Sequence, residues 1–133
     1  MLEKVEHIGI AVKNLHEAEE KYTYLLGVKP YKREEVKTEK VITSFFRLGE
    51  TKIELLAATS PESPIARFIE KRGEGIHHIA YATDDIKAEL KRLEKEGFEI
   101  ITPQPKKGAD NKLVAFIHPR SAGGVLIELC QDI

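Results

Sequence analysis

The sequence predicts an α+β protein built from two tandem βαβββ modules. Two observations support this prediction. The chain repeats itself: residues 5–15 align with residues 76–86 at a shift of 71 residues, and the tripeptide Ile-Glu-Leu at 53–55 recurs at 127–129, a shift of 74. Within each repeat, an alternating strand pattern is followed by a helical pattern and then by further strand-like runs. A duplicated module with a small loop insertion accounts for both shifts.

The first module is predicted to span residues 1–59. Its opening strand places the bulky Ile8, Ile10 and Val12 on one face and a histidine with small residues on the other. A helix follows, with Asn14 as its N-cap and Gly27 as its stop. Its apolar face should cover the bulky face of the strand, and consists of Leu15, Ala18, Tyr22, Leu25 and Leu26. Further strands are predicted at 28–36, 41–48 and 52–57.

A linker is predicted at residues 60–75, with a turn and a short helix, and the second module at 76–133. The helix of the second module follows Asp84-Asp85 and ends at Gly97. Its apolar positions are Ile86, Leu90 and Leu93. Strands are predicted at 98–101, 113–117 and 125–130, and the Pro- and Gly-containing stretch 102–111 is expected to form a loop.

Composition narrows the function classes. The 133 residues suit one compact domain, and 21 Lys and Arg against 22 Asp and Glu leave a net charge of −1. That charge provides no general attraction for nucleic acid or an anionic membrane. The single cysteine, Cys130, cannot form an internal disulfide. The first twenty residues contain no apolar run, so neither a signal peptide nor a membrane span is expected, and the protein is predicted to be cytoplasmic.

Two glutamates and two histidines occupy equivalent positions in the two modules. Glu54 and Glu128 each lie inside an apolar strand, where an ionised carboxylate needs a partner. His7 and His78 each lie in the opening strand of a module. Together they offer a nitrogen and oxygen ligand set for a divalent transition metal. For either glutamate alone, a half-exposed strand with a lysine partner is the simpler explanation. The duplicated order of histidine and glutamate favours the metal site.

Other candidate residues have simpler explanations. His16 lies on the polar side of a helix, His77 points opposite to its neighbour, and His118 precedes a proline in a loop, although it could face a ligand. Lys106 and Lys107 suit a solvated loop better than an anion site. No phosphate-binding loop, dinucleotide-binding glycine motif or serine nucleophile motif is present.

The chain resembles the vicinal oxygen chelate superfamily, also called the glyoxalase, bleomycin resistance and dioxygenase superfamily, along essentially its whole length. Within it, the sequence is similar to the methylmalonyl-CoA epimerase family. The similar segments are 7–12, 63–66, 75–79, 116–120 and 123–129. The resemblance implies one domain over residues 1–133, in which a cupped mixed sheet surrounds a metal site and the helices lie on its outer face.

The resemblance also implies the site and the reaction. His7, Glu54, His78 and Glu128 would bind a divalent ion, with Co²⁺ expected and Mn²⁺, Ni²⁺ or Zn²⁺ also compatible with these ligands. The (2R) and (2S) epimers of methylmalonyl-CoA would interconvert through a metal-stabilised enolate, with Glu128 as one proton carrier. The second carrier stays open, because residues 41–45 contain no glutamate.

The implied partners are the substrate and a second copy of the chain, as a homodimer. Lys106, His118 and Arg120 are candidate contacts for the anionic CoA moiety. Two other functions fit the same resemblance. One is a lactoylglutathione lyase of the glyoxalase I type, which uses a similar ligand set. The other is a non-catalytic protein of the same fold that binds a small molecule; the intact ligand set counts against it.

Overall fold

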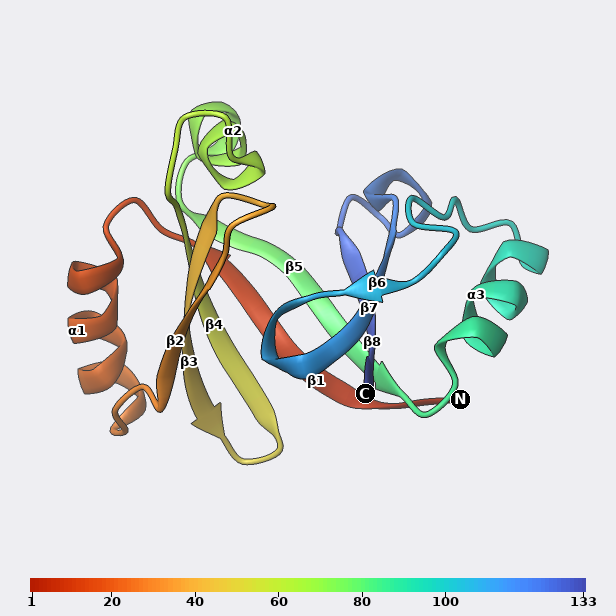
Figure 1. Ribbon diagram of the computed structural model, residues 1–133, viewed down its shortest axis with the longest axis horizontal. Helices are drawn as coiled ribbons and strands as arrows, with labels where there is room; N and C mark the ends of the chain where they lie inside the picture. The colour runs from red at the N-terminus through yellow and green to blue at the C-terminus, as the bar shows by residue number, and fades with distance from the viewer. The chain divides into compact units, whose positions relative to one another are not determined.

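The computed structural model describes residues 1–133, and its elements follow the predicted order of two βαβββ modules joined by a helix (Figure 1). The first module contains β1 (Leu2–Ala11), α1 (Leu15–Leu26), β2 (Lys32–Val36), β3 (Val41–Leu48) and β4 (Thr51–Ala58). The joining helix is α2 (Pro64–Arg72). The second module contains β5 (Gly75–Thr83), α3 (Ile86–Lys95), β6 (Lys106–Lys107), β7 (Lys112–Ile117) and β8 (Ile127–Asp132).

The strands form a mixed sheet, which confirms the α+β prediction. Their hydrogen-bonded order is β2-β3-β4-β1-β5-β8-β7-β6. The pair β5 and β8 is parallel, whereas β2–β3, β3–β4, β6–β7 and β7–β8 are antiparallel. The chain divides into two compact units: one contains residues 8–77, and the other, here called the composite unit, contains residues 1–7 and 78–133. The predicted module boundaries stay a prediction.

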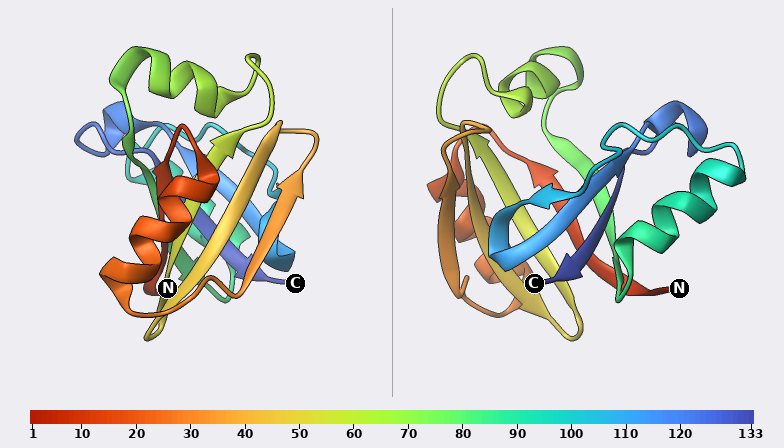
Figure 2. Two further views of the ribbon diagram at one scale, coloured as in Figure 1. Left: turned by 90° about the vertical axis from the view of Figure 1, so that its left-hand side faces the viewer. Right: turned by 45° about the vertical axis from the view of Figure 1, so that its right-hand side comes forward.

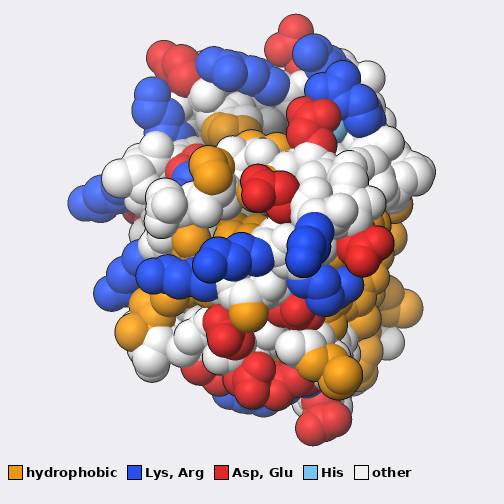
Figure 3. All heavy atoms as spheres, turned by 90° about the vertical axis from the view of Figure 1, so that its right-hand side faces the viewer, with side chains coloured by type: hydrophobic (Ala, Val, Ile, Leu, Met, Phe, Trp, Pro, Cys, Tyr) orange, Lys and Arg blue, Asp and Glu red, His pale blue; other side chains and the backbone are white.

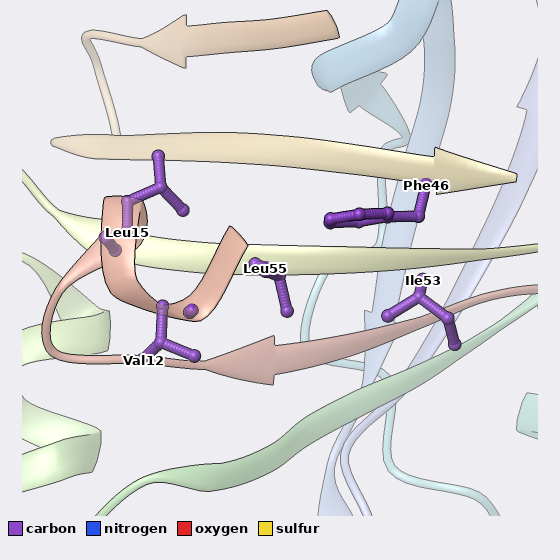
Figure 4. Close-up of a cluster of buried hydrophobic side chains, with 7 residues drawn as sticks. Val12, Leu15, Phe46, Ile53 and Leu55 are labelled. Atoms are coloured by element: carbon purple, nitrogen blue, oxygen red, sulfur yellow. The ribbon is translucent and has the colours of Figure 1, made fainter. Parts of the chain in front are cut away.

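In the 8–77 unit, α1 packs on the bulky face of the strands, as predicted. The Asn14 side chain accepts a hydrogen bond from the Glu17 backbone N–H, and Gly27 ends the helix in the left-handed conformation. Figure 4 labels five buried side chains of the core between the helix and the strands, namely Val12, Leu15, Phe46, Ile53 and Leu55. Leu25 was expected to join them, but it is 72% exposed. The other predicted positions of the helix, Leu15, Ala18, Tyr22 and Leu26, do pack in this core.

Leu55→Ala is expected to destabilise the protein by about 2–5 kcal/mol. The Leu55 side chain is 0% exposed and packs in the core beneath α1, so its removal leaves a cavity. Denaturant unfolding followed by circular dichroism measures the change in unfolding free energy. Leu48→Ala is the matched control, because Leu48 lies at the end of β3 and is 47% exposed. Equal losses in the two variants would contradict this core assignment.

In the composite unit, α3 covers one face of the strands (Figure 2). The Asp85 side chain caps the helix by accepting a hydrogen bond from the Ala88 N–H. The buried face of α3, formed by Ile86, Leu90 and Leu93 as predicted, packs against Ala115, Ile117 and Leu129. In the β5–β8 ladder, Ala80 lies opposite Glu128. Leu129 packs against α3, and side chains alternate along β8, so the neighbouring Glu128 lies on the opposite face of the strand, away from the helix.

The predicted strand at 98–101 is wrong. Its only ladder contact is an isolated bridge between Ile100 and Ile117. Pro103 and Pro105 follow directly and lack backbone N–H donors, so a regular ladder cannot continue through them. Pairing resumes at β6, a two-residue strand inside the stretch that was predicted as a loop. A 3₁₀ turn at Ala109–Asn111 follows β6, and another lies at Pro119–Ser121.

The surface carries mixed charge. On the face shown in Figure 3, Lys and Arg side chains lie interspersed with Asp and Glu side chains. This distribution agrees with the nearly balanced composition of 21 basic and 22 acidic residues. None of the helices combines the length and the apolar character that crossing a membrane requires.

Candidate metal centre

Three of the four predicted ligands meet inside the composite unit. His7 comes from β1, His78 from β5 and Glu128 from β8. The Nε2 atoms of the two histidines are 3.0 Å apart. Glu128 Oε1 lies 3.2 Å from His78 Nε2 and 3.6 Å from His7 Nε2. Two nitrogen atoms and one carboxylate oxygen thus face a common point.

The spacing of these three atoms suits a first-row divalent ion. Metal–ligand distances of about 2.1 Å separate neighbouring ligand atoms by about 3.0 Å at right angles and about 3.4 Å in a tetrahedron. The three observed separations, 3.0, 3.2 and 3.6 Å, lie around these values. Imidazole nitrogen and carboxylate oxygen are also ligand types that such ions accept. The residues present therefore fit a metal.

The site is buried and held by packing. His7, His78 and Glu128 are each about 5% exposed. The imidazoles stand edge to face, with ring centroids 5.1 Å apart. The Phe116 ring lies edge-on to His78, with centroids 6.1 Å apart, and Phe116 is also the cross-strand partner of Glu128. These contacts restrict the orientation of both rings before any ligand binds.

The Glu128 carboxyl is ionised over the whole physiological range. Burial by itself raises its pKa, but hydrogen bonds and charge from His7 and His78 outweigh burial and lower the pKa to about 2. The burial of Glu128 and of Glu54 also excludes the half-exposed strands that were the simpler explanation for these residues. A buried anion between two imidazoles is an arrangement that attracts a cation.

Glu54, the fourth predicted ligand, lies in the 8–77 unit. It is buried in the middle of β4, where its cross-strand partner is Phe45. Its neighbours Ile53 and Leu55 point into the core beneath α1, so alternation puts the Glu54 carboxylate on the opposite face of β4. Its role as a ligand is part of the proposal below.

Sequence reasoning missed Glu6 and Lys112. Glu6 contacts the candidate ligand His7, and Lys112 contacts Glu6. Glu6 Oε1 lies 2.8 Å from His7 Nδ1, and Lys112 Nζ lies 4.0 Å from Glu6 Oε2. Alternation placed Glu6 on the apolar face with Ile8 and Ile10, which is an unfavourable position for a carboxylate without a partner. A carboxylate on an apolar face, directly before a candidate ligand, was the signal in the sequence that could have identified Glu6.

The candidate CoA contacts lie outside this cluster. The His118 side chain accepts a hydrogen bond from the Arg120 backbone N–H, at the 3₁₀ turn. The Arg120 guanidinium pairs with Glu99, at 2.9 and 3.0 Å. Lys106 is exposed in β6. These three residues stay predictions as substrate contacts.

The remaining histidines have structural contacts, in line with the sequence interpretation. His16 pairs with Glu20 one helical turn away, at an exposed position on α1. The His77 ring lies edge-on to Phe68 of α2, with centroids 4.9 Å apart. Adjacent residues of β5 thus serve different purposes, with His77 packing in the 8–77 unit and His78 in the cluster of the composite unit.

Comparison with known proteins identifies the family. The family model described as Glyoxalase/Bleomycin resistance protein/Dioxygenase superfamily matches residues 6–116. The mitochondrial methylmalonyl-CoA epimerase of Dictyostelium discoideum is 42% identical over 127 residues, which cover 95% of this chain and 76% of that protein. The ethylmalonyl-CoA/methylmalonyl-CoA epimerase of Cereibacter sphaeroides is 39% identical, over 98% of this chain and 99% of that protein.

A solved structure supports the same family assignment. A methylmalonyl-CoA epimerase in complex with methylmalonyl-CoA and NH₄⁺ superimposes with a TM-score of 0.94 and 28% identity, covering 99% of this chain and 96% of that one. These relatives are epimerases, and this chain is accordingly an enzyme of the isomerase class. It belongs to the glyoxalase/bleomycin resistance protein/dioxygenase superfamily and, within it, to the methylmalonyl-CoA epimerase family.

Proposed function

We propose that this protein interconverts the (2R) and (2S) epimers of methylmalonyl-CoA in a reaction that depends on a divalent metal ion. The supporting observation is the convergence of His7 Nε2, His78 Nε2 and Glu128 Oε1 in a buried cluster. It occurs in a fold that closely matches an epimerase solved with methylmalonyl-CoA. The relatives support the substrate, and the donor atoms support the metal.

His7, His78 and Glu128 would hold the ion, and Glu54 is the proposed fourth ligand. We take Co²⁺ as the first ion to test, and Mn²⁺, Ni²⁺ and Zn²⁺ also accept mixed nitrogen and oxygen ligation. When bound, the ion supplies a fixed positive charge that stabilises the negative charge developing on the thioester oxygen as the C2 proton leaves.

Glu128 is the proposed proton carrier on one face of the substrate. Its carboxylate is unprotonated at neutral pH, as a proton acceptor must be. Burial lowers the water content around the carboxylate and so strengthens its electrostatic interactions within the site. The Nε2 atoms of His78 and His7 lie 3.2 and 3.6 Å from Glu128 Oε1 and flank the carboxylate.

Inversion at C2 also needs a proton carrier on the opposite face of the planar enolate. The β3 segment 41–45 supplies no glutamate, so this carrier must come from another part of the site. Glu54 is buried and carries a carboxylate, and it is our candidate for this second role as well as for the fourth ligand. Glu54→Gln in the same exchange assay tests it.

Proton NMR of racemic methylmalonyl-CoA in deuterated water tests the proposed function. With the protein and Co²⁺, the C2 proton signal should disappear at a catalytic rate, and protein stripped of metal should leave it unchanged. Persistence of the signal with folded, metal-loaded protein would rule out this function. The hemithioacetal of glutathione and a 2-oxoaldehyde, the substrate of glyoxalase I, would then be the next compound to test.

The proposed enzyme acts as a homodimer, which is what the family resemblance implies. Light scattering on the purified protein measures its oligomeric state directly.

A further inference from the structure

Glu6 is a buried carboxylate that no part of the proposed reaction uses. Its side chain is 5% exposed, and its Oε1 atom lies 2.8 Å from His7 Nδ1. An ionised carboxylate can only accept hydrogen bonds, so Nδ1 must be the donor in this contact. The hydrogen bond therefore places the proton of a neutral His7 ring on Nδ1.

Lys112 is an ion-pair partner of Glu6 through the carboxylate oxygen that does not contact His7. The Lys112 ammonium lies 4.0 Å from Glu6 Oε2, and its side chain is only 13% exposed. Lys112 also pairs with Asp132, its cross-strand partner in β8. A chain of charged groups thus runs from Asp132 at the surface through Lys112 and Glu6 to His7.

A proton on Nδ1 leaves the lone pair of His7 on Nε2. This is the atom that lies 3.0 Å from His78 Nε2 and 3.6 Å from Glu128 Oε1. A metal ligand must present a lone pair, and the hydrogen bond of its other nitrogen decides which atom does so. We propose that Glu6 is a positioning residue: it holds His7 as the Nδ1–H tautomer and directs Nε2 toward the metal. This inference rests on the proposed function.

Glu6 and His7 could instead belong to a second metal site that includes Cys130. Glu6, His7 and Cys130 have potential ligand atoms within 4.8 Å of one another, and all three residues are buried. The 2.8 Å contact, however, engages His7 Nδ1 with Glu6. Cys130 Sγ lies 3.6 Å from the Tyr81 carbonyl oxygen, to which its S–H can donate. The geometry favours a hydrogen-bonded support over a second metal site.

Nitrogen-15 NMR of the metal-free protein tests the tautomer directly. We expect the His7 ring to show a protonated Nδ1 and an unprotonated Nε2. Glu6→Gln is expected to lose this fixed preference, because a neutral amide can either accept from Nδ1 or donate to it. A protonated Nε2 with a bare Nδ1 in the unmodified protein would overturn the inference. This readout requires neither bound metal nor activity.

Cobalt affinity, measured by competition with a chelator, tests the consequence. Glu6→Gln should bind Co²⁺ about 10–100-fold more weakly than the unmodified protein, which is the usual effect of losing the carboxylate partner of a ligand histidine. Glu3→Gln is the matched control, because Glu3 is an exposed residue of the same strand. Unchanged affinity in a folded Glu6→Gln protein would overturn the positioning role.

The same titration separates this inference from the proposed function. If the unmodified protein binds no divalent ion, the proposed metal site fails, while the NMR spectrum still reports on the contact between Glu6 and His7. A thiolate-to-cobalt charge-transfer band that disappears in Cys130→Ser would instead place the metal on Cys130, and would overturn the positioning role. The absence of that band, together with weakened binding in Glu6→Gln, supports it.

Discussion

Glu128→Gln is expected to slow exchange of the C2 proton of methylmalonyl-CoA by about 10³-fold. The amide keeps the shape of the side chain and retains an oxygen that can bind a metal. It removes the negative charge and the basic oxygen that would accept the proton, so the chemical step should suffer much more than substrate binding. Exchange rates in deuterated water, measured at saturating Co²⁺ and at several substrate concentrations, separate the effect on kcat from the effect on KM.

Two controls make the result on Glu128 specific. Glu94→Gln introduces the same chemical change at an exposed position of α3, in the same unit, and should exchange normally. Metal analysis of Glu128→Gln shows whether the cobalt is still present. Near-normal exchange in the metal-loaded variant would remove Glu128 from the proton transfer, whereas loss of exchange together with loss of cobalt would assign the effect to metal binding.

The fold was readable from the sequence because it is duplicated and because each helix has clear boundaries. Asn14 caps α1 and Gly27 ends it, as the local pattern indicated. Leu25 was misplaced, because a helical stripe defined by apolar residues includes any leucine near its edge, and only packing decides which ones are buried. The strand at 98–101 failed for a similar reason: its apolar residues fit a strand, but the prolines after it prevent a regular ladder.

The candidate site was readable only in part. Alternation gives the face on which a side chain lies, and equivalent positions in the two modules directed attention to His7, His78 and Glu128. Alternation gives no information about partners that reach a residue from another strand. Glu6 lies in β1 and Lys112 in β7, with β5 and β8 between them in the sheet, so their contact depends on how several strands are arranged in the folded sheet.

His78→Ala is expected to weaken Co²⁺ binding by at least about 100-fold. Losing a hydrogen-bond partner of a ligand already costs 10–100-fold in metal proteins, and the removal of a ligand should exceed that range. At a free cobalt concentration of 100 times the dissociation constant, the metal stabilises the unmodified protein by about 2.7 kcal/mol. For a chain of this length, that corresponds to a rise in Tm of roughly 10 °C. In His78→Ala the same concentration should raise Tm by no more than about 2 °C.

The neighbouring His77→Ala provides the matched comparison. It removes an imidazole from the adjacent position of the same strand, but that ring packs against Phe68 and takes no part in the cluster. Its Tm without metal should fall because of the lost packing, while its rise on adding cobalt should equal that of the unmodified protein. An undiminished rise in His78→Ala would show that the cation binds without this imidazole. Equal loss of the rise in both variants would show that a general change in β5, and not the loss of a ligand, controls metal binding.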